Sequence, residues 1–185
     1  MGRGNVAIEL FFNPRGLIFD GTAAIGSLGF TADIRQGNLN LGGVWVGQGQ
    51  VDGRVYVTGN NVAKVFEVDL ESWSVRRTFD TGAGPYNLAV SEDERTLVVT
   101  YKGSNAVGFW DLHTGTERAR VSTTRTIPHG VMLTPDGAYA VVTIEGIGDE
   151  PGTVEVYDID TATRVAEVDV GKQAGGIAFW KVEGV

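Results

Sequence analysis

The stretch Val55-Tyr56-Val57-Thr58-Gly59-Asn60 has two counterparts further along the chain. These are Leu97-Val98-Val99-Thr100 and Ala140-Val141-Val142-Thr143, so the three threonines follow one another at steps of 42 and 43 residues. Short runs rich in β-branched residues are typical of β-strands. A fixed period of about 40 residues indicates a repeat architecture, in which each unit is one supersecondary element.

Each repeat carries further landmarks after its threonine. A second apolar run ends in an aspartate, at Asp69, Asp111 and Asp158, and the third repeat holds four extra residues in the insertion 146–151. A turn and two more apolar runs follow each aspartate, and no window shows apolar residues at helical spacing. Four short strands per unit of about 43 residues is the period of a propeller blade. The sequence therefore predicts an all-β fold of β-propeller blades, each with four antiparallel strands, and a β-sandwich with coincidental spacing is the alternative.

Composition excludes several functional classes. The 185 residues carry 15 Lys and Arg against 23 Asp and Glu, a net charge of −8, which is the wrong sign for neutralising nucleic-acid phosphates. The chain has no cysteine, so disulfides, thiolate zinc sites and cysteine nucleophiles are excluded. No apolar run approaches the roughly 20 residues of a membrane span, and the first residues lack the order of a secretory signal peptide. We expect a soluble protein with no nucleic-acid or membrane partner, and its localisation stays unknown.

The chain divides at about residue 50. Residues 1–50 hold 11 of the 27 glycines and six charges that cancel, so the whole net charge falls in residues 51–185. We interpret residues 51–185 as three blades and residues 1–50 as a Gly-rich N-terminal segment, a degenerate blade that ends in an inner strand over residues 38–46. An unstructured appendage is the alternative for this segment.

Three motifs resemble a known family. They are Tyr56-Val57-Thr58-Gly59-Asn60, Pro128-His129-Gly130 and Pro135-Asp136-Gly137. Together they are similar to the YVTN repeat of lactonase-like and surface-layer β-propellers, and the resemblance covers residues 51–181, as the C-terminal portion of such a propeller. It implies that the runs after Pro85-Tyr86-Asn87 and after Pro128-His129-Gly130 are the innermost strands of their blades, and it suggests a lactonase-like hydrolase. Because the motif mostly encodes strands and turns, it is specific for fold rather than for function.

Three blades alone leave strand edges and apolar faces uncovered. Members of the family usually carry seven blades, so we expect this truncated propeller to be closed by oligomerisation, as a homo-oligomer and most simply a dimer. A single chain that curls into a four-bladed ring is the alternative.

Candidate site residues follow from the expected hairpins. In the hairpin around Pro135-Asp136-Gly137, facing residues have numbers that sum to about 273, which sets His129 opposite Glu145. The same construction around residues 93–94 sets Tyr86 opposite Lys102. In a propeller these positions lie on one face, at the mouth of the central channel, together with the acidic insertion. The candidate residues on this face are His129, Glu145, Tyr86, Asn87, Lys102, Asp149 and Glu150.

Two interpretations of this face stay open. In the first, His129 and Glu145 are catalytic and a divalent metal, such as zinc, manganese or calcium, activates water to hydrolyse a lactone, ester or phosphoester. The metal ligands are then His129, Glu145, Asp149 and Glu150, and the ligand-binding residues are Tyr86, Asn87 and Lys102. In the second, the face binds a protein, peptide or small-molecule ligand without catalysis, and a neighbouring carboxylate simply satisfies His129.

Other polar residues are given structural interpretations. His113 falls in a turn on the opposite side of the blade and is expected to be exposed. The outer-strand arginines are interpreted as protection of the sheet edge against further strand pairing; they are Arg76, Arg77, Arg118 and Arg120. The sequence holds no nucleophile elbow and no Gly-rich nucleotide loop.

Overall fold

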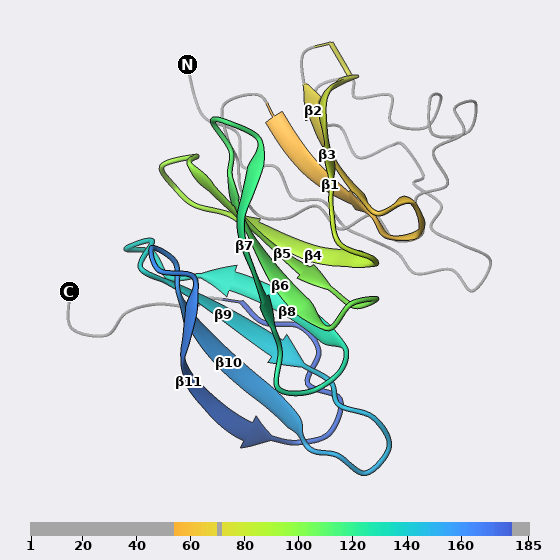
Figure 1. Ribbon diagram of the computed structural model, residues 1–185, viewed down its shortest axis with the longest axis vertical. Coiled ribbons are helices and arrows are strands. Elements are labelled where there is room, and N and C mark those ends of the chain that lie inside the picture. The colour runs from red at the N-terminus through yellow and green to blue at the C-terminus, as the bar shows by residue number, and fades with distance from the viewer. Residues whose placement is uncertain (1–53, 70–71, 179–185) are drawn as a thin grey trace, which may run out of the picture. The chain divides into compact units, whose positions relative to one another are not determined.

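The computed structural model describes residues 54–69 and 72–178, all of which belong to one compact unit spanning Leu41–Val185. These residues form eleven β-strands and a single turn of 3-10 helix, η1 (Asn60–Val62). The strands make three antiparallel sheets, shown in Figure 1. The predicted all-β fold with blade-like sheets is therefore confirmed.

The first sheet, sheet A, is built from three described strands. In order across the sheet they are β1 (Arg54–Gly59), β2 (Lys64–Asp69) and β3 (Ser74–Asp80). The threonine of the first repeat lies in β1, next to η1 and the left-handed Ala63 that begin the turn into β2. The expected inner strand over residues 38–46, and the whole segment 1–50, lie outside the described residues.

The second and third sheets each contain four strands in sequence order. Sheet B runs β4 (Pro85–Val90), β5 (Thr96–Tyr101), β6 (Ala106–Asp111) and β7 (Thr116–Ser122). Sheet C runs β8 (Pro128–Leu133), β9 (Tyr139–Ile144), β10 (Gly152–Asp158) and β11 (Thr163–Val170). Sheets B and C start with the strands that carry Pro85-Tyr86-Asn87 and Pro128-His129-Gly130, which is the strand order that the family resemblance implies. Each of these two sheets therefore begins one strand earlier in the chain than the strand that carries the repeated threonine.

Between the turn and the bulge of each hairpin, the facing residues are those expected from the sequence. Val131 faces Val142 and Met132 faces Val141, so the numbers of facing residues sum to 273. In the other hairpin Leu88 faces Val99 and the sum is 187. Both hairpins contain a bulge that falls between Pro85 and Leu88 in β4 and between Pro128 and Val131 in β8. A bulge re-aims the side chains of its strand, and here it holds the motif residues that include Tyr86 and His129.

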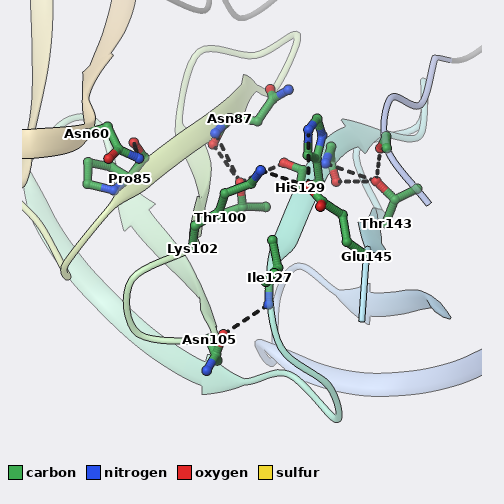
Figure 2. A network of polar contacts seen from close by, with 12 residues as sticks. Asn60, Pro85, Asn87, Thr100, Lys102, Asn105, Ile127, His129, Thr143 and Glu145 are labelled. Atoms are coloured by element: carbon green, nitrogen blue, oxygen red, sulfur yellow. Dashed lines mark hydrogen bonds and ion pairs between the residues drawn. The ribbon is translucent and has the colours of Figure 1, made fainter. Parts of the chain in front are cut away.

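The repeated threonines join each sheet to the next. The buried hydroxyls of Thr58 and Thr100 donate hydrogen bonds to the backbone carbonyls of Tyr86 (2.9 Å) and His129 (2.9 Å) in the following sheet. Thr143 makes the same bond to the carbonyl of Gly175, beyond the last strand. Thr58 and Thr100 therefore fix the starts of β4 and β8, and Thr143 makes the equivalent bond to the segment after β11. Figure 2 shows the bonds made by Thr100 and Thr143.

Each sheet also encloses a cluster of one tyrosine, one glutamate and one arginine. In sheet A the fully buried Glu67 accepts hydrogen bonds from Tyr56 (3.2 Å) and from the guanidinium Nε of Arg77 (2.7 Å). The corresponding groups are Tyr101, Glu117 and Arg120 in sheet B, and Tyr157, Glu155 and Arg164 in sheet C. Burial of an ionised carboxylate is costly unless it is paired and hydrogen-bonded, so the clusters make the buried Glu67 and Glu155 tolerable inside their sheets, whereas Glu117 is partly exposed. The apolar cores around them are the clusters between sheets A and B and between sheets B and C.

Two outer-strand arginines do more than protect an edge. Arg77 of β3 donates to the carbonyl of Leu112 (2.9 Å), and Arg118 of β7 donates to the carbonyl of Ile159 (3.1 Å). Both carbonyls lie in the turn that follows the third strand of the next sheet. Edge protection alone is therefore an incomplete interpretation of these arginines, because they tie neighbouring sheets together at the outer side.

Two expectations concern the chain as a whole. Closure of the ring by a second copy stays a prediction. Within the described part of the chain no helix is long and apolar enough to cross a membrane.

Candidate functional site

The chain brings Tyr86, Lys102, His129 and Glu145 together, and we call these four residues the rim cluster. Tyr86 and His129 lie in the bulged starts of β4 and β8, whereas Lys102 and Glu145 come directly after β5 and β9. A left-handed residue precedes each motif, Gly84 with φ 65° and Ile127 with φ 67°. The backbone amides of Lys102 and Glu145 bond to the carbonyls of these two residues, at 2.8 and 3.0 Å. The same local geometry is therefore built twice, once in each sheet.

The carboxylate of Glu145 is the centre of the rim cluster. Its Oε1 lies 2.8 Å from the ammonium nitrogen of Lys102, which comes from the neighbouring sheet, and 3.4 Å from Nε2 of His129. All three side chains are largely shielded, with 17 to 23% of each exposed. Figure 2 shows the Lys102 and His129 side chains converging on this carboxylate. The predicted approach of His129 and Glu145 is present in the structure.

Tyr86 contributes an aromatic surface to the cluster. Its ring centroid lies 4.6 Å from that of His129 in an edge-on arrangement, and the Lys102 ammonium sits 3.6 Å from the Tyr86 centroid. A cation at this distance is attracted by the quadrupole of the ring. The expected proximity of the Tyr86 and Lys102 side chains is thus also present. Asn87, the next residue, uses its side-chain oxygen to accept a bond from the Leu88 amide at 2.8 Å.

The environment keeps the imidazole neutral. Burial of the ring lowers the pKa of His129, the nearby Lys102 ammonium lowers it further, and the Glu145 carboxylate raises it. The net effect is a pKa below the ordinary value of 6.5. With one ammonium, one carboxylate and a neutral imidazole, the rim cluster carries no net charge at neutral pH.

The two acidic residues of the insertion are engaged elsewhere. Asp149 pairs with Lys172 at 2.5 Å and its side chain is fully exposed, while Glu150 accepts a bond from the backbone amide of Ile147 at 3.3 Å. Over residues 54–69 and 72–178, no three His, Asp or Glu side chains lie close enough together to hold a metal ion. A metal bound between His129 and Glu145 would also have to displace the Lys102 ammonium. Among the described residues, His129 and Glu145 are thus the two candidate ligands that lie together, and the metal site stays a prediction.

The link between Lys102 and Glu145 is the feature of the site that the sequence pattern did not predict. The two residues are 43 positions apart, which is one repeat, so they occupy equivalent positions in neighbouring sheets. A turn fixes which residues face each other within a hairpin, but it says nothing of pairing between equivalent positions of successive repeats. The signal that could have found the link is opposite charge at one repeat position, lysine in one unit and glutamate in the next.

Comparison with known proteins supports the fold. No family model matches the chain, and no curated protein matches it. Solved structures do match, among them the hydrazine synthase of Kuenenia stuttgartiensis, with 22% sequence identity and a TM-score of 0.61 over 64% of this chain and 34% of that chain. Another is U3-55K, with 13% identity and a TM-score of 0.58 over 66% of this chain and 38% of that chain.

These similarities define the class of fold. The sheets of three and four antiparallel strands match structures that contain β-propellers, so the chain has a β-propeller-like fold. The sequence identities are too low to carry more than the fold. The chain spans little more than a third of the length of either structure.

Proposed function

We propose that this protein is a non-catalytic β-propeller binding module, and that the rim cluster is part of the surface that recognises a segment of a partner protein. The observation that carries the proposal is the state of the Glu145 carboxylate. It is already held by the Lys102 ammonium at 2.8 Å and faces His129 at 3.4 Å. A carboxylate that is already paired with an ammonium group is poorly suited to binding a metal ion. It is well suited to a polar surface whose side chains are held in one orientation.

The chemistry of the cluster indicates the kind of ligand. Lys102 and the Tyr86 hydroxyl can donate hydrogen bonds, while Glu145 and the neutral imidazole can accept them. The main chain of an extended peptide carries both hydrogen-bond donors and acceptors that can pair with these groups. The Tyr86 ring adds an apolar contact of the kind that is enriched at protein interfaces. Because the cluster carries no net charge, recognition is expected to depend weakly on salt.

A second function is hydrolysis of a lactone, ester or phosphoester, as the YVTN-like, lactonase-like resemblance suggests. The lowered pKa of His129 favours it, because a neutral imidazole is the form that acts as a general base. The divalent metal predicted from the sequence at His129 and Glu145 stays a part of this alternative. This alternative predicts turnover that is lost in His129→Ala, whereas the binding module predicts none.

The test is selection of a random linear peptide library on the full chain, followed by measurement of the selected peptides by fluorescence anisotropy. Peptides are expected to be enriched, to bind with affinities that change less than about threefold between low and high salt, and to lose binding to Lys102→Met. Lys172→Met is the matched control, because it removes a lysine that pairs with the exposed Asp149 instead.

Two results would contradict the proposal. One is the absence of any enriched peptide, or binding that is unaffected by Lys102→Met. The other is turnover of a lactone, ester or phosphoester by the full chain that disappears in His129→Ala, which would support the hydrolase instead.

A further inference from the structure

A cleft of about 820 Å³ opens at the other end of the strands from the rim cluster. Its position follows from the sheet topology, because it reaches Thr96 at the start of β5 and Asp111 at the end of β6, whereas Lys102 lies beyond the opposite end of β5. Five of the eight arginines in the described part of the chain line it. They are Arg54, Arg76, Arg77, Arg95 and Arg118.

Three of these arginines approach the carboxylates of the cleft at more than hydrogen-bonding distance. Arg54 lies 3.9 Å from Glu67 and 3.8 Å from Glu94, Arg76 lies 3.7 Å from Glu67, and Arg95 lies 3.9 Å from Asp93. These separations exceed the usual range of a hydrogen bond between nitrogen and oxygen. The planar guanidinium carries five N–H donors that match the oxygens of a carboxylate or phosphate. These three guanidinium groups can therefore donate hydrogen bonds to a bound oxyanion.

The other two arginines are held in place by the fold. Arg77 and Arg118 donate to the carbonyls of Leu112 and Ile159 in neighbouring turns. Arg77 is also paired with Glu67 at 2.5 Å. Anchored guanidinium groups lose little freedom when a ligand binds, which favours affinity.

A buried oxygen supplies an independent sign of a ligand. Glu67 is fully buried and lines the cleft, and among the described residues its Oε1 has no hydrogen-bond partner although its Oε2 has two. A buried carboxylate oxygen left without a donor is unfavourable. A hydroxyl group that reaches this oxygen from the cleft would satisfy it.

We propose that this cleft binds a small hydroxylated oxyanion, such as a sugar phosphate or a hydroxy acid. Its phosphate or carboxylate contacts Arg54, Arg76 and Arg95, and an adjacent hydroxyl donates to Oε1 of Glu67. The four carboxylates of the lining, Glu67, Asp93, Glu94 and Asp111, offset most of the five guanidinium charges, so the remaining positive charge suits a ligand with one anionic group rather than a polyanion. The site is separate from the rim cluster and does not rest on the function proposed there.

Isothermal titration calorimetry of the full chain tests this with glycerol 3-phosphate, malate, inorganic phosphate and glycerol. At least one of the first two is expected to bind saturably, and the tighter one identifies phosphate or carboxylate as the preferred group. Arg76→Gln should weaken that binding by about 10-fold or more, the effect of losing one charge-assisted hydrogen bond. Arg76 is 56% exposed, so its loss is expected to leave the fold intact. Arg120→Gln, which removes an exposed arginine outside the cleft, should leave binding unchanged.

Three outcomes would overturn the inference. The first is that neither glycerol 3-phosphate nor malate binds. The second is that the Arg76→Gln protein binds the ligand as tightly as the unaltered chain while it remains folded by circular dichroism. The third outcome is that inorganic phosphate binds as tightly as glycerol 3-phosphate, which would remove the role given to Glu67 and the hydroxyl. Peptide binding at the rim cluster is a separate readout, so it can fail or succeed independently of these results.

Discussion

Replacing Thr100 by valine removes the hydroxyl that joins sheets B and C while keeping the shape of the side chain. This threonine is fully buried in β5. Its Oγ1 donates to the carbonyl of His129 at 2.9 Å and accepts a bond from the amide of Asn87 at 3.0 Å. Valine can do neither, because it offers no polar atom. The change therefore leaves one carbonyl and one amide, both partly buried, without these partners.

The size of the effect follows from the number of bonds lost. A net contribution of about 1 kcal/mol for each of the two hydrogen bonds sets the lower value, about 2 kcal/mol, and a cost of about 2 kcal/mol for each group left without its partner sets the upper value, about 4 kcal/mol. We expect Thr100→Val to lower the free energy of unfolding by about 2 to 4 kcal/mol. Thr100→Ser keeps the hydroxyl and loses only a methyl group, so it should cost about 1 kcal/mol.

Urea denaturation followed by circular dichroism measures the difference. With a slope of about 2 kcal/mol per molar urea, Thr100→Val should move the midpoint down by about 1 to 2 M, and Thr100→Ser by about half of the smaller shift. Thr78→Val, at an exposed position of β3, controls for the chemistry of the substitution and should stay within about 0.5 kcal/mol. Equal stability of the Thr100→Val and Thr100→Ser proteins would refute the reasoning, because it would mean that the hydroxyl does not hold the sheets together.

Two further predictions concern His129 and Gly108. NMR titration of the His129 imidazole should give a pKa below 6.5, and the pKa should rise in Lys102→Met because a nearby positive charge is removed. As the pH falls, the unfolded chain takes up the proton before the folded chain does, so the stability due to the neutral imidazole is present above pH 6.5 and declines below it. A pKa at or above 6.5 in the folded chain would contradict this prediction. Gly108→Ala should destabilise the fold by about 1 to 3 kcal/mol in the same urea assay, because its Cβ would lie 2.2 Å from the Tyr101 hydroxyl and 2.5 Å from Glu117 Oε1. Gly171→Ala is the control, because no atom of the described residues lies within 4 Å of its new Cβ. Equal urea midpoints for the two variants would contradict the prediction, because they would mean that the Tyr101 and Glu117 side chains move aside at little cost.

The strands and their hairpin register could be predicted because both are local. The threonine period fixes β1, β5 and β9, and a turn such as Pro135-Asp136-Gly137 sets which residues face each other across a hairpin. The approach of His129 to Glu145 follows from the same rule, since the two lie in one hairpin. Sequence alone therefore reached as far as pairs within a single sheet.

The contacts that sequence did not reveal all join sheets or enclose charge. The pairing of Lys102 with Glu145 depends on how two sheets lie side by side, which no period specifies. The buried Glu67 and Glu155 resemble ordinary strand residues in the sequence, although a single glutamate inside an apolar run is a signal of buried pairing. The placement of residues 1–50 and the expected dimer stay predictions.

The threonine bond between sheets has a consequence for how such a chain can change its length. Each unit supplies its own donor and, about 30 residues later, its own acceptor, at separations of 28, 29 and 32 residues. A tandem duplication of one unit would copy both halves of the joint at once, and the new sheet would arrive with a partner on either side. Loss of a whole unit would likewise leave the donor of one neighbour facing the acceptor of the next. Gain and loss of sheets are thus open to this fold without any compensating substitution at the joint.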